Sequence, residues 1–358
     1  MDKAPVDQIL VGDCVEVMNE FPEKCADIIF ADPPYNLQLQ GELRRPDMSR
    51  VDAVDDEWDK FDSFADYDQF TRSWLAAARR VLSDEGTIWV IGSYHNIYRV
   101  GAIMMDLGFW ILNDIVWIKQ NPMPQMRGVR FCNAHETIIW AKKSEAQSRY
   151  TFHYRALKSG NEDKQMRSDW TIPLCTGGER LAIDGKKVHT TQKPEALLHR
   201  ILTASSNPGD LALDPFCGTG TTAAVAKKLG RRYITIDRDA GYVEAARKRV
   251  SAIRLSAADI EQESVHVDAP PRRTPFISMV ETGKLPAGTV LRLRSTDITA
   301  AVQADGTIVC GGYRGSIHKI GARCLGFPSC NGWTYWLYKD AITGKEQLID
   351  ELRDHQGI

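Results

Sequence analysis

The amino-acid sequence predicts an α/β fold with a mostly parallel sheet and helices on both faces, followed by a small α+β domain. Short apolar runs alternate with stretches of helical periodicity, and a glycine-rich segment follows one of these runs. Residues 256–274 then mix small, charged and proline residues without a period, and strand-like segments follow them. We therefore expect a first domain over residues 1–255, a linker over 256–274 and a second domain over 275–358.

The elements of the first domain alternate along the chain. The expected strands are short apolar runs that cover residues 26–32, 86–93, 110–119, 136–143, 210–214 and 231–237. The expected helices repeat apolar residues at helical spacing, and they cover residues 68–86, 96–109, 193–206, 221–230 and 240–254. Strands that alternate with helices favour a parallel sheet that is covered on both faces.

The second domain has a different pattern. Residues 289–310 predict short strands with a turn at Asp305-Gly306. Residues 332–340 predict a strand rich in aromatic side chains, and residues 345–356 predict a last helix. We expect Trp336 and Tyr338 to lie on opposite faces of that strand, so that one of them belongs to the core.

Composition and charge exclude some classes of protein. No apolar stretch reaches membrane-spanning length, and the first ten residues lack the apolar core of a signal peptide, so we expect a cytoplasmic protein. The eight cysteines form no Cys-x-x-Cys pair, which favours free thiols over disulfides or a metal site. The net charge is only −2, but residues 119–190 hold thirteen basic against seven acidic residues. This basic stretch favours contact with a polyanion and an ordinary solvated surface equally.

The segment Leu-Ala-Leu-Asp-Pro-Phe-Cys-Gly-Thr-Gly-Thr-Thr, residues 211–222, indicates a cofactor site. A strand leads into a loop with Gly218 and Gly220, and the next strand ends at Asp237, a carboxylate suited to a ribose diol. The alternative is a tight turn without a ligand. The loop has neither the Gly-Lys-Ser/Thr of a P-loop nor the third glycine of a dinucleotide site. A nucleoside cofactor without phosphates fits this pattern, and S-adenosylmethionine (AdoMet) qualifies.

The segment Asp32-Pro33-Pro34-Tyr35 forms a rigid corner after an apolar strand. The exocyclic amine of a purine is a poor nucleophile, so its methylation requires acceptors that hold both of its N–H groups. Asp32 and a backbone carbonyl of Pro33 or Pro34 could be these acceptors. Tyr35 could stack on a base that has left the duplex. The alternative is a simple turn that ends the strand.

The two segments together resemble the motifs of the β class of N6-adenine DNA methyltransferases, in which the catalytic motif precedes the AdoMet motif. Gly-Asp-Cys at 12–14 and Thr-Gln-Lys-Pro at 191–194 also fit this class. The chain most closely resembles the cell-cycle-regulated (CcrM-type) enzymes of α-proteobacteria, and more distantly HinfI-type enzymes. Its tail, from Gly315, resembles the RAMA domain. This resemblance implies a Rossmann-like AdoMet-dependent methyltransferase sheet and transfer to N6 of a flipped-out adenine in duplex DNA.

The resemblance also implies further properties. The expected recognition sequence is GANTC, the expected working form is a homodimer, and no metal takes part. A bacterial, nucleoid-associated protein with a role in DNA replication and the cell cycle is expected. The sequence motifs carry over residue by residue to catalytic Asp32, Pro33, Pro34 and Tyr35, and to cofactor-binding Asp13, Thr191, Lys193, Asp214, Phe216, Gly218, Gly220, Thr221 and Asp237.

The resemblance places target recognition in residues 119–190, between the two motifs. Side chains able to contact phosphates or base edges are candidates there and after the catalytic corner, and aromatic side chains of the tail are candidates for stacking on unpaired bases. These candidates are Arg44, Arg45, Arg127, Arg130, Asn133, His135, Trp333, Tyr335 and Trp336. For each of them, an ordinary surface or structural role is the alternative.

Other activities fit the residues less well. A cytosine-C5 methyltransferase needs a Pro-Cys pair, which this chain lacks. Cytosine-N4 enzymes usually carry serine where Asp32 stands, and methyltransferases that act on protein glutamine or RNA usually carry asparagine there. A DNA-binding regulator without catalysis is a further alternative, although both motifs are intact.

Overall fold

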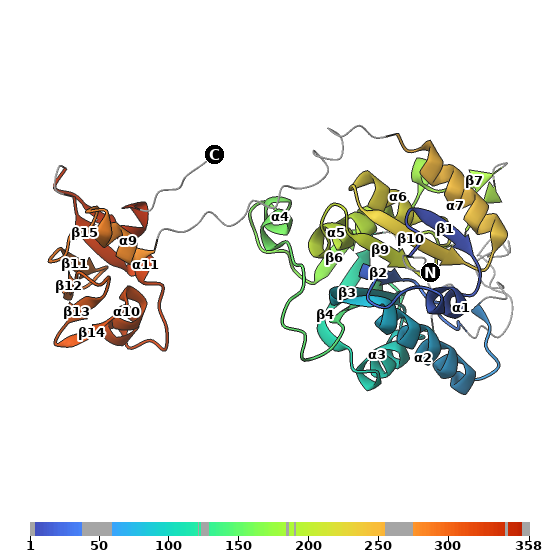
Figure 1. The fold of residues 1–358 in the computed structure, drawn as a ribbon, viewed down its shortest axis with the longest axis horizontal. Helices are drawn as coiled ribbons and strands as arrows, with labels where there is room; N and C mark the ends of the chain where they lie inside the picture. Colours follow the sequence, from blue (N-terminus) through green and yellow to red (C-terminus); the bar gives the residue numbers. More distant parts are fainter. Residues whose placement is uncertain are drawn as a thin grey trace. The chain divides into compact units, whose positions relative to one another are not determined.

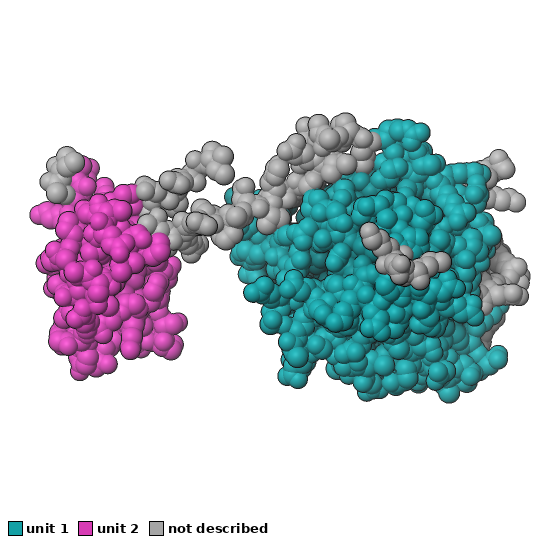
Figure 2. Space-filling view, in the orientation of Figure 1, with its two compact units in different colours: residues 1–267 teal, residues 268–358 magenta. Residues whose placement is uncertain are grey.

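A computed structural model describes most of the chain as two compact units, residues 1–267 and residues 268–358 (Figure 2). The described residues are 4–37, 59–120, 122, 129–183, 186–189, 191–254, 275–340 and 343–352. The expected linker over 256–274 lies outside them. Among the described residues, the first unit holds two apolar clusters and the second unit holds one.

The first unit contains an eight-stranded sheet with the strand order β1-β10-β9-β2-β3-β5-β4-β6 (Figure 1). Its strands are β1 (Gln8–Val11), β2 (Ala26–Ala31), β3 (Leu82–Gly92), β4 (Trp110–Lys119), β5 (His135–Lys142), β6 (Asp169–Ile172), β9 (Leu211–Asp214) and β10 (Arg232–Asp237). Only β5 runs antiparallel to its neighbours. The prediction of a mostly parallel sheet is confirmed.

Helices cover both faces of this sheet (Figure 1). They are α1 (Cys14–Asn19), α2 (Phe64–Val81), α3 (Ile97–Asp106), α4 (Tyr154–Ser159), α5 (Glu195–Ser205), α6 (Thr221–Lys228) and α7 (Ala240–Ala252). Side chains of a strand alternate between the two faces, so neighbouring residues of β2 enter different cores. Ile28 packs with α5, α6 and α7, whereas Ile29 packs with α1, α2 and α3.

The boundary between α2 and β3 differs from the prediction. The helix expected over 68–86 ends at Val81, and Leu82 begins the long strand β3. Leu82 is completely buried and pairs with Ala26 of β2. Burial in the sheet therefore overrides the helical preference of the polar residues that follow.

The strand directions bring distant segments to one edge. Strands β2, β9 and β10 are parallel neighbours, so the residues at their carboxyl ends, Asp32, Asp214 and Asp237, meet there. Strands β3 and β4 are both antiparallel to β5, so β4 ends and β5 begins at this same edge. A small hairpin, β7 (Ala182–Ile183) with β8 (Lys186–Lys187), completes the unit.

The described residues of the second unit form an antiparallel sheet with the order β14-β13-β12-β11-β15-β16 and three short helices. The elements are α9 (Phe276–Glu281), β11 (Val290–Leu293), β12 (Thr299–Val302), β13 (Ile308–Cys310), β14 (Tyr313–Gly315), α10 (Ile317–Leu325), α11 (Gly332–Tyr335), β15 (Trp336–Lys339) and β16 (Glu346–Leu348). The sequence correctly predicts the short strands and the turn at Asp305-Gly306.

Two expectations for this unit are wrong. The segment expected as one strand over 332–340 is divided between α11 and β15. The helix expected over 345–356 begins instead as β16, which pairs with β15 and is followed by a 3-10 turn over Ile349–Leu352. Residues 353–358 lie outside the described part. The hairpin pairing therefore outweighs the helical periodicity of this segment.

The aromatic residues of the tail also need a correction. Trp336 is completely buried, and Trp333 and Tyr338 are 6% and 8% exposed. Trp336 and Tyr338 lie on the same face of β15, because side chains two positions apart on a strand share a face. The indole N–H of Trp336 donates to the Ile317 carbonyl at 2.9 Å. Trp333 and Trp336 belong to the core of this unit, and Tyr335 packs against it, so the two tryptophans do not offer a stacking surface.

Candidate active site

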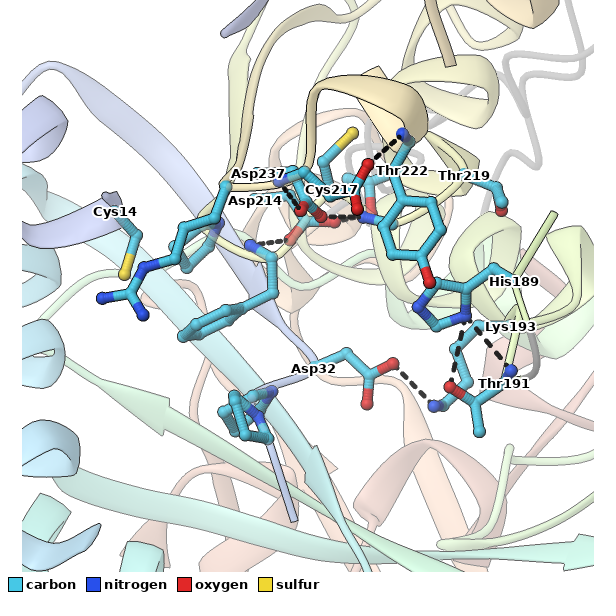
Figure 3. Close-up of a pocket in the computed structure, with 18 of the residues that line it drawn as sticks. Cys14, Asp32, His189, Thr191, Lys193, Asp214, Cys217, Thr219, Thr222 and Asp237 are labelled. Atoms are coloured by element: carbon cyan, nitrogen blue, oxygen red, sulfur yellow. Dashed lines mark hydrogen bonds and ion pairs between the residues drawn. The ribbon is translucent and has the colours of Figure 1, made fainter. Parts of the chain in front are cut away.

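A cavity of about 530 Å³ opens at the carboxyl edge of the large sheet (Figure 3). Its walls come from the corner after β2, the glycine loop after β9, the end of β10 and the segment before α5. The predicted site residues that line it are Asp32, Pro33, Pro34, Tyr35, Thr191, Lys193, Asp214, Phe216, Gly218, Thr221 and Asp237. Two sequence motifs separated by about 180 residues thus share one cavity.

The corner after β2 is held in shape by a buried carboxylate. Asp59, which is 8% exposed, accepts hydrogen bonds from the backbone N–H groups of Tyr35 at 2.5 Å, Asn36 at 2.8 Å and Leu37 at 2.9 Å. Asn36 has a positive φ of 53°, which turns the backbone toward this carboxylate. The sequence alone does not indicate this role for Asp59, because many acidic residues surround it between residues 47 and 68, a pattern typical of a solvated surface.

The two proline carbonyls of the corner have different surroundings. The Pro34 carbonyl accepts a hydrogen bond from the Tyr67 hydroxyl at 2.9 Å and a longer one from Asn96 at 3.5 Å. Burial raises the pKa of Tyr67 to about 12, so its hydroxyl stays a donor. Within the described part of the chain, no hydrogen bond reaches the Pro33 carbonyl. Pro33 is therefore the better candidate for the backbone acceptor.

Asp32 belongs to a buried chain of charges. Its Oδ2 atom lies 2.6 Å from Lys193 Nζ, and Figure 3 shows the two side chains facing each other. The Tyr35 hydroxyl lies 3.0 Å from both Asp32 Oδ1 and Glu136 Oε2. Glu136 Oε1 in turn lies 2.7 Å from Lys119 Nζ. The sequence analysis missed Glu136 and Lys119, which come from the two strands β5 and β4.

Burial and neighbouring charges shift the pKa values of these side chains in different directions. Burial raises the pKa of Asp32, and Lys193 opposes this rise. Burial alone would also raise the pKa of Glu136, but Lys193 and Lys119 outweigh it, so the pKa is lowered. Burial alone would lower the pKa of Lys193, but Asp32 and Glu136 outweigh it and raise the pKa. Lys193 and Glu136 are therefore charged at neutral pH.

The glycine loop is shaped by Asp214 at the end of β9. Its two carboxylate oxygens accept from the Phe216 N–H group at 2.9 Å and from the Thr222 hydroxyl at 2.5 Å. Gly218 and Gly220 have positive φ angles of 50° and 74°, which favour glycine. A Cβ atom on Gly220 would lie 2.7 Å from the Cβ of Ala246, so Gly220 allows α6 and α7 to pack closely. Unlike Gly218, Gly220 is not among the described residues that line the cavity.

Asp237 closes the opposite side of this loop. Its Oδ2 atom accepts from the Gly218 N–H group at 2.7 Å, and its Oδ1 atom accepts from the Asp239 N–H group at 3.0 Å. Burial raises the pKa of Asp237. A carboxylate at the end of β10, beside a glycine without a side chain, suits the hydroxyl groups of a ribose.

Asp13 has a structural role that the sequence analysis did not predict. Its carboxylate caps α1 by accepting from the N–H groups of Val15 at 2.9 Å and Glu16 at 3.2 Å, and it forms an ion pair with Arg238. Burial by itself would raise the pKa of Asp13, but these partners outweigh it and lower the pKa. The neighbours of Asp13, residues 12 and 14, line the cavity, whereas Asp13 is not among the described lining residues.

The segment before α5 contributes Thr191 and Lys193 as predicted, and also His189, which the sequence analysis missed. The Thr191 N–H group donates to His189 Nδ1 at 3.1 Å, and the His189 ring lies 4.8 Å from the Tyr242 ring. Burial, with a contribution from Lys193, lowers the pKa of His189 to about 4, so the imidazole is neutral. A histidine two residues before the Thr-Gln-Lys-Pro motif was the signal that could have identified it.

The remaining candidates for DNA contact lie at the start of β5 and in the loop before it. Arg130, Asn133 and His135 are exposed, and Arg130 donates to the Tyr94 hydroxyl at 2.8 Å. This loop leaves the same sheet edge as the catalytic corner. Three further candidates, Arg44, Arg45 and Arg127, lie outside the described residues.

Other features of the described residues bear on alternative chemistry. All eight cysteines are free thiols. Cys217 in the glycine loop is buried, its Sγ atom accepts from the Thr235 hydroxyl at 3.1 Å, and burial raises its pKa, so it is a poor thiolate. Across the described ranges, no group of three side chains could hold a metal ion, and no helix is long and apolar enough to cross a membrane.

Comparisons with known proteins identify the family. Residues 26–248 match the N6_N4_Mtase family model, described as DNA methylase. The chain belongs to this family. The type II methyltransferase M.HinfI of Haemophilus influenzae is 46% identical over 329 residues, which cover 92% of this chain and 91% of that protein. The type II methyltransferase M2.DpnII of Streptococcus pneumoniae is 43% identical over 241 residues, which cover 67% and 88%.

Solved structures agree with this assignment. The M1.HpyAVI–SAM complex is 26% identical, has a TM-score of 0.51, and matches 68% of this DNA methylase and 98% of that chain. The cytosine-N4-specific PvuII DNA methyltransferase is 21% identical with a TM-score of 0.55, and matches 74% of this chain and 93% of that one. The second likeness shows the fold alone. The predictions of an AdoMet-dependent methyltransferase fold and of AdoMet as the cofactor are confirmed.

Proposed function

We propose that this DNA methylase transfers the methyl group of AdoMet to N6 of an adenine that is flipped out of duplex DNA. The observation that carries the proposal is that Asp32, Pro33 and Tyr35 line the cavity together, while no hydrogen bond within the described part of the chain reaches the Pro33 carbonyl. Two acceptors next to an aromatic face are what an exocyclic amine on a planar base requires. The same segments would also accept the amine of cytosine, so the choice of adenine rests on aspartate rather than serine at position 32.

Each residue of the corner would have a different role at the target base. Asp32 and the Pro33 carbonyl would accept the two N–H groups of the amine and draw its lone pair out of conjugation with the ring. The Tyr35 ring would support one face of the base. When the new C–N bond forms, the amine nitrogen must lose a proton, and Asp32 is placed to receive it. Burial raises the pKa of Asp32, which makes it a better base for this step.

The residues of the cavity fit AdoMet at its other end. Bound AdoMet supplies an electrophilic methyl group on a sulfonium centre. Asp237 would hold the ribose, with Gly218 leaving room for close approach. Thr191 and Lys193 would hold the methionine end. Since Lys193 contacts Asp32 in this structure, it lies between the cofactor part and the base part of the cavity.

Further properties follow from the resemblance to CcrM-type and HinfI-type enzymes. We infer that the site is methylated within GANTC, and the 46% identity with M.HinfI over most of both chains supports this inference. A homodimer that works in the bacterial cytoplasm, near the nucleoid, in DNA replication and the cell cycle is part of the same proposal. So is a RAMA-like tail that contacts DNA, through exposed basic residues such as Arg294, Lys319 and Arg323 rather than through its tryptophans.

One experiment tests the reaction and the sequence context together. Duplex DNA with and without GANTC sites is incubated with the protein and labelled AdoMet, and the DNA is then digested to nucleosides. We expect labelled N6-methyl-2′-deoxyadenosine, and we expect it only from DNA that contains GANTC. Labelled N4-methyl-2′-deoxycytidine would overturn the assignment of adenine as the target base and assign cytosine instead. Methyladenine in DNA that lacks the sequence would overturn the proposed site.

A further inference from the structure

The hydroxyl group of Tyr35 lies between two carboxylates, and it can donate a hydrogen bond to only one of them at a time. It lies 3.0 Å from Asp32 Oδ1 and 3.0 Å from Glu136 Oε2. A tyrosine hydroxyl carries one hydrogen, so only one of these two oxygens receives it at a time. Glu136 is 9% exposed and is not among the described residues that line the cavity, so it does not meet the substrate directly.

The neighbouring charges decide what each carboxylate can do. Asp32 Oδ2 is engaged by Lys193 at 2.6 Å, so Oδ1 is the oxygen left for an incoming amine. If Tyr35 donates to Oδ1, its hydrogen takes one of the two lone pairs of that oxygen and weakens it as an acceptor for the N–H group of the target. A hydroxyl that gives up this bond needs another acceptor, because a buried donor without one is costly. Glu136 offers that hydroxyl a second acceptor at the same distance.

We propose that Glu136 is a positioning residue for the reaction: it accepts the Tyr35 hydroxyl and so releases Asp32 Oδ1 for the target amine. The inference rests on the proposed amine methylation and assigns a further residue to it. Rotation of one O–H bond moves the hydrogen from Asp32 to Glu136 without moving the Tyr35 ring, which keeps its place in the cavity wall. Lys193 and Lys119, the latter 2.7 Å from Glu136, keep this carboxylate ionised and therefore able only to accept.

The role of Lys119 makes a glutamine at position 136 informative. An ammonium group only donates, so a glutamine would turn its amide oxygen toward Lys119 and its NH2 group toward Tyr35. Tyr35 would then accept that hydrogen bond and could give its own hydrogen only to Asp32. If Lys119 is also removed, the amide is free to turn its oxygen toward Tyr35.

The test compares two double variants with the same net charge. Lys119→Met with Glu136→Gln keeps an acceptor for Tyr35, whereas Lys119→Met with Glu136→Met removes it. Neither variant leaves a buried charge without its partner. We expect the glutamine variant to transfer methyl groups in a single turnover roughly ten- to a hundredfold faster than the methionine variant. Both should bind AdoMet with the same affinity, as measured by calorimetry.

A third substitution tests whether residue 136 acts through the Tyr35 hydroxyl or only through its packing. In the presence of Tyr35→Phe the hydroxyl is gone, so the two double variants should transfer at equal rates. Equal rates with Tyr35 in place, or a difference that persists after Tyr35→Phe, would overturn the inference. If the double variants do not fold, Glu136→Gln is compared with wild type, with and without Tyr35→Phe, and the same two results decide. The nucleoside formed by the wild type is determined separately, and a product without a methylated exocyclic amine would overturn the proposed function itself.

Discussion

Asp214 gives the folded chain a pH dependence that one substitution should remove. The side chain lies at the end of β9, is 3% exposed, and accepts hydrogen bonds from the Phe216 N–H group at 2.9 Å and the Thr222 hydroxyl at 2.5 Å. Burial raises the pKa of Asp214 from 3.8 to about 7, because the two hydrogen bonds only partly replace the lost water. The folded chain therefore keeps a proton on Asp214 that the unfolded chain has released.

The sign and size of the effect follow from this difference. Between pH 3.8 and about 7 the folded state binds more protons than the unfolded state, so the free energy of unfolding falls as the pH rises through this range. Above pH 7 both states are ionised and the contribution is constant. Between pH 5 and pH 8, a shift of this size lowers the free energy of unfolding by about 2–3 kcal/mol.

Asp214→Asn should remove this contribution, because asparagine keeps an acceptor oxygen and does not ionise. Urea unfolding of wild type and variant is measured at pH 5 and at pH 8, with the exposed substitution Asp163→Asn as the matched control. From pH 5 to pH 8 we expect the variant to gain about 2–3 kcal/mol relative to wild type. The control variant should show no such gain in the free energy of unfolding relative to wild type. A difference between variant and wild type that is the same at both pH values would refute the reasoning.

Three further substitutions or deletions test the site and the tail. Asp32→Ala should abolish methyl transfer and leave AdoMet affinity within about tenfold of wild type, because Asp32 acts at the target amine; near-normal turnover would contradict its role. Asp237→Ala should weaken AdoMet binding by about 1.5–3 kcal/mol through the loss of a charge-assisted bond to the ribose, and unchanged affinity in calorimetry would rule out that contact. Truncation after Arg273 should preserve AdoMet binding and weaken DNA binding, since the cavity lies in the first unit. A folded truncated chain that methylates DNA like the full chain would end this idea, and loss of a dimer with unchanged DNA affinity would assign the tail to dimerisation.

The sequence by itself determined the features that depend on neighbouring residues. The alternation of apolar runs and helical stretches gave the α/β sheet, and both motifs were visible because a corner or a glycine loop is made by consecutive residues. The carboxyl ends of parallel strands lie at one edge of a sheet, so a parallel sheet places Asp32, Asp214 and Asp237 at the same edge, while the strand order decides that they are neighbours. The DNA methylase family followed from these same segments.

Only the tertiary structure decided which side chains support these motifs. Asp59 and Glu136 lie far from the corner in sequence, and nothing in their local pattern separates them from surface residues. Burial likewise moved Trp333 and Trp336 from an expected DNA surface to the core of the second unit. The physical reason is the exclusion of water by surrounding chain segments. Where water is excluded, electrostatic interactions are stronger and a polar group needs a partner within the protein. Which segments exclude water at a given residue depends on which strands become neighbours. The order of strands in a sheet cannot be predicted from any single segment of the sequence.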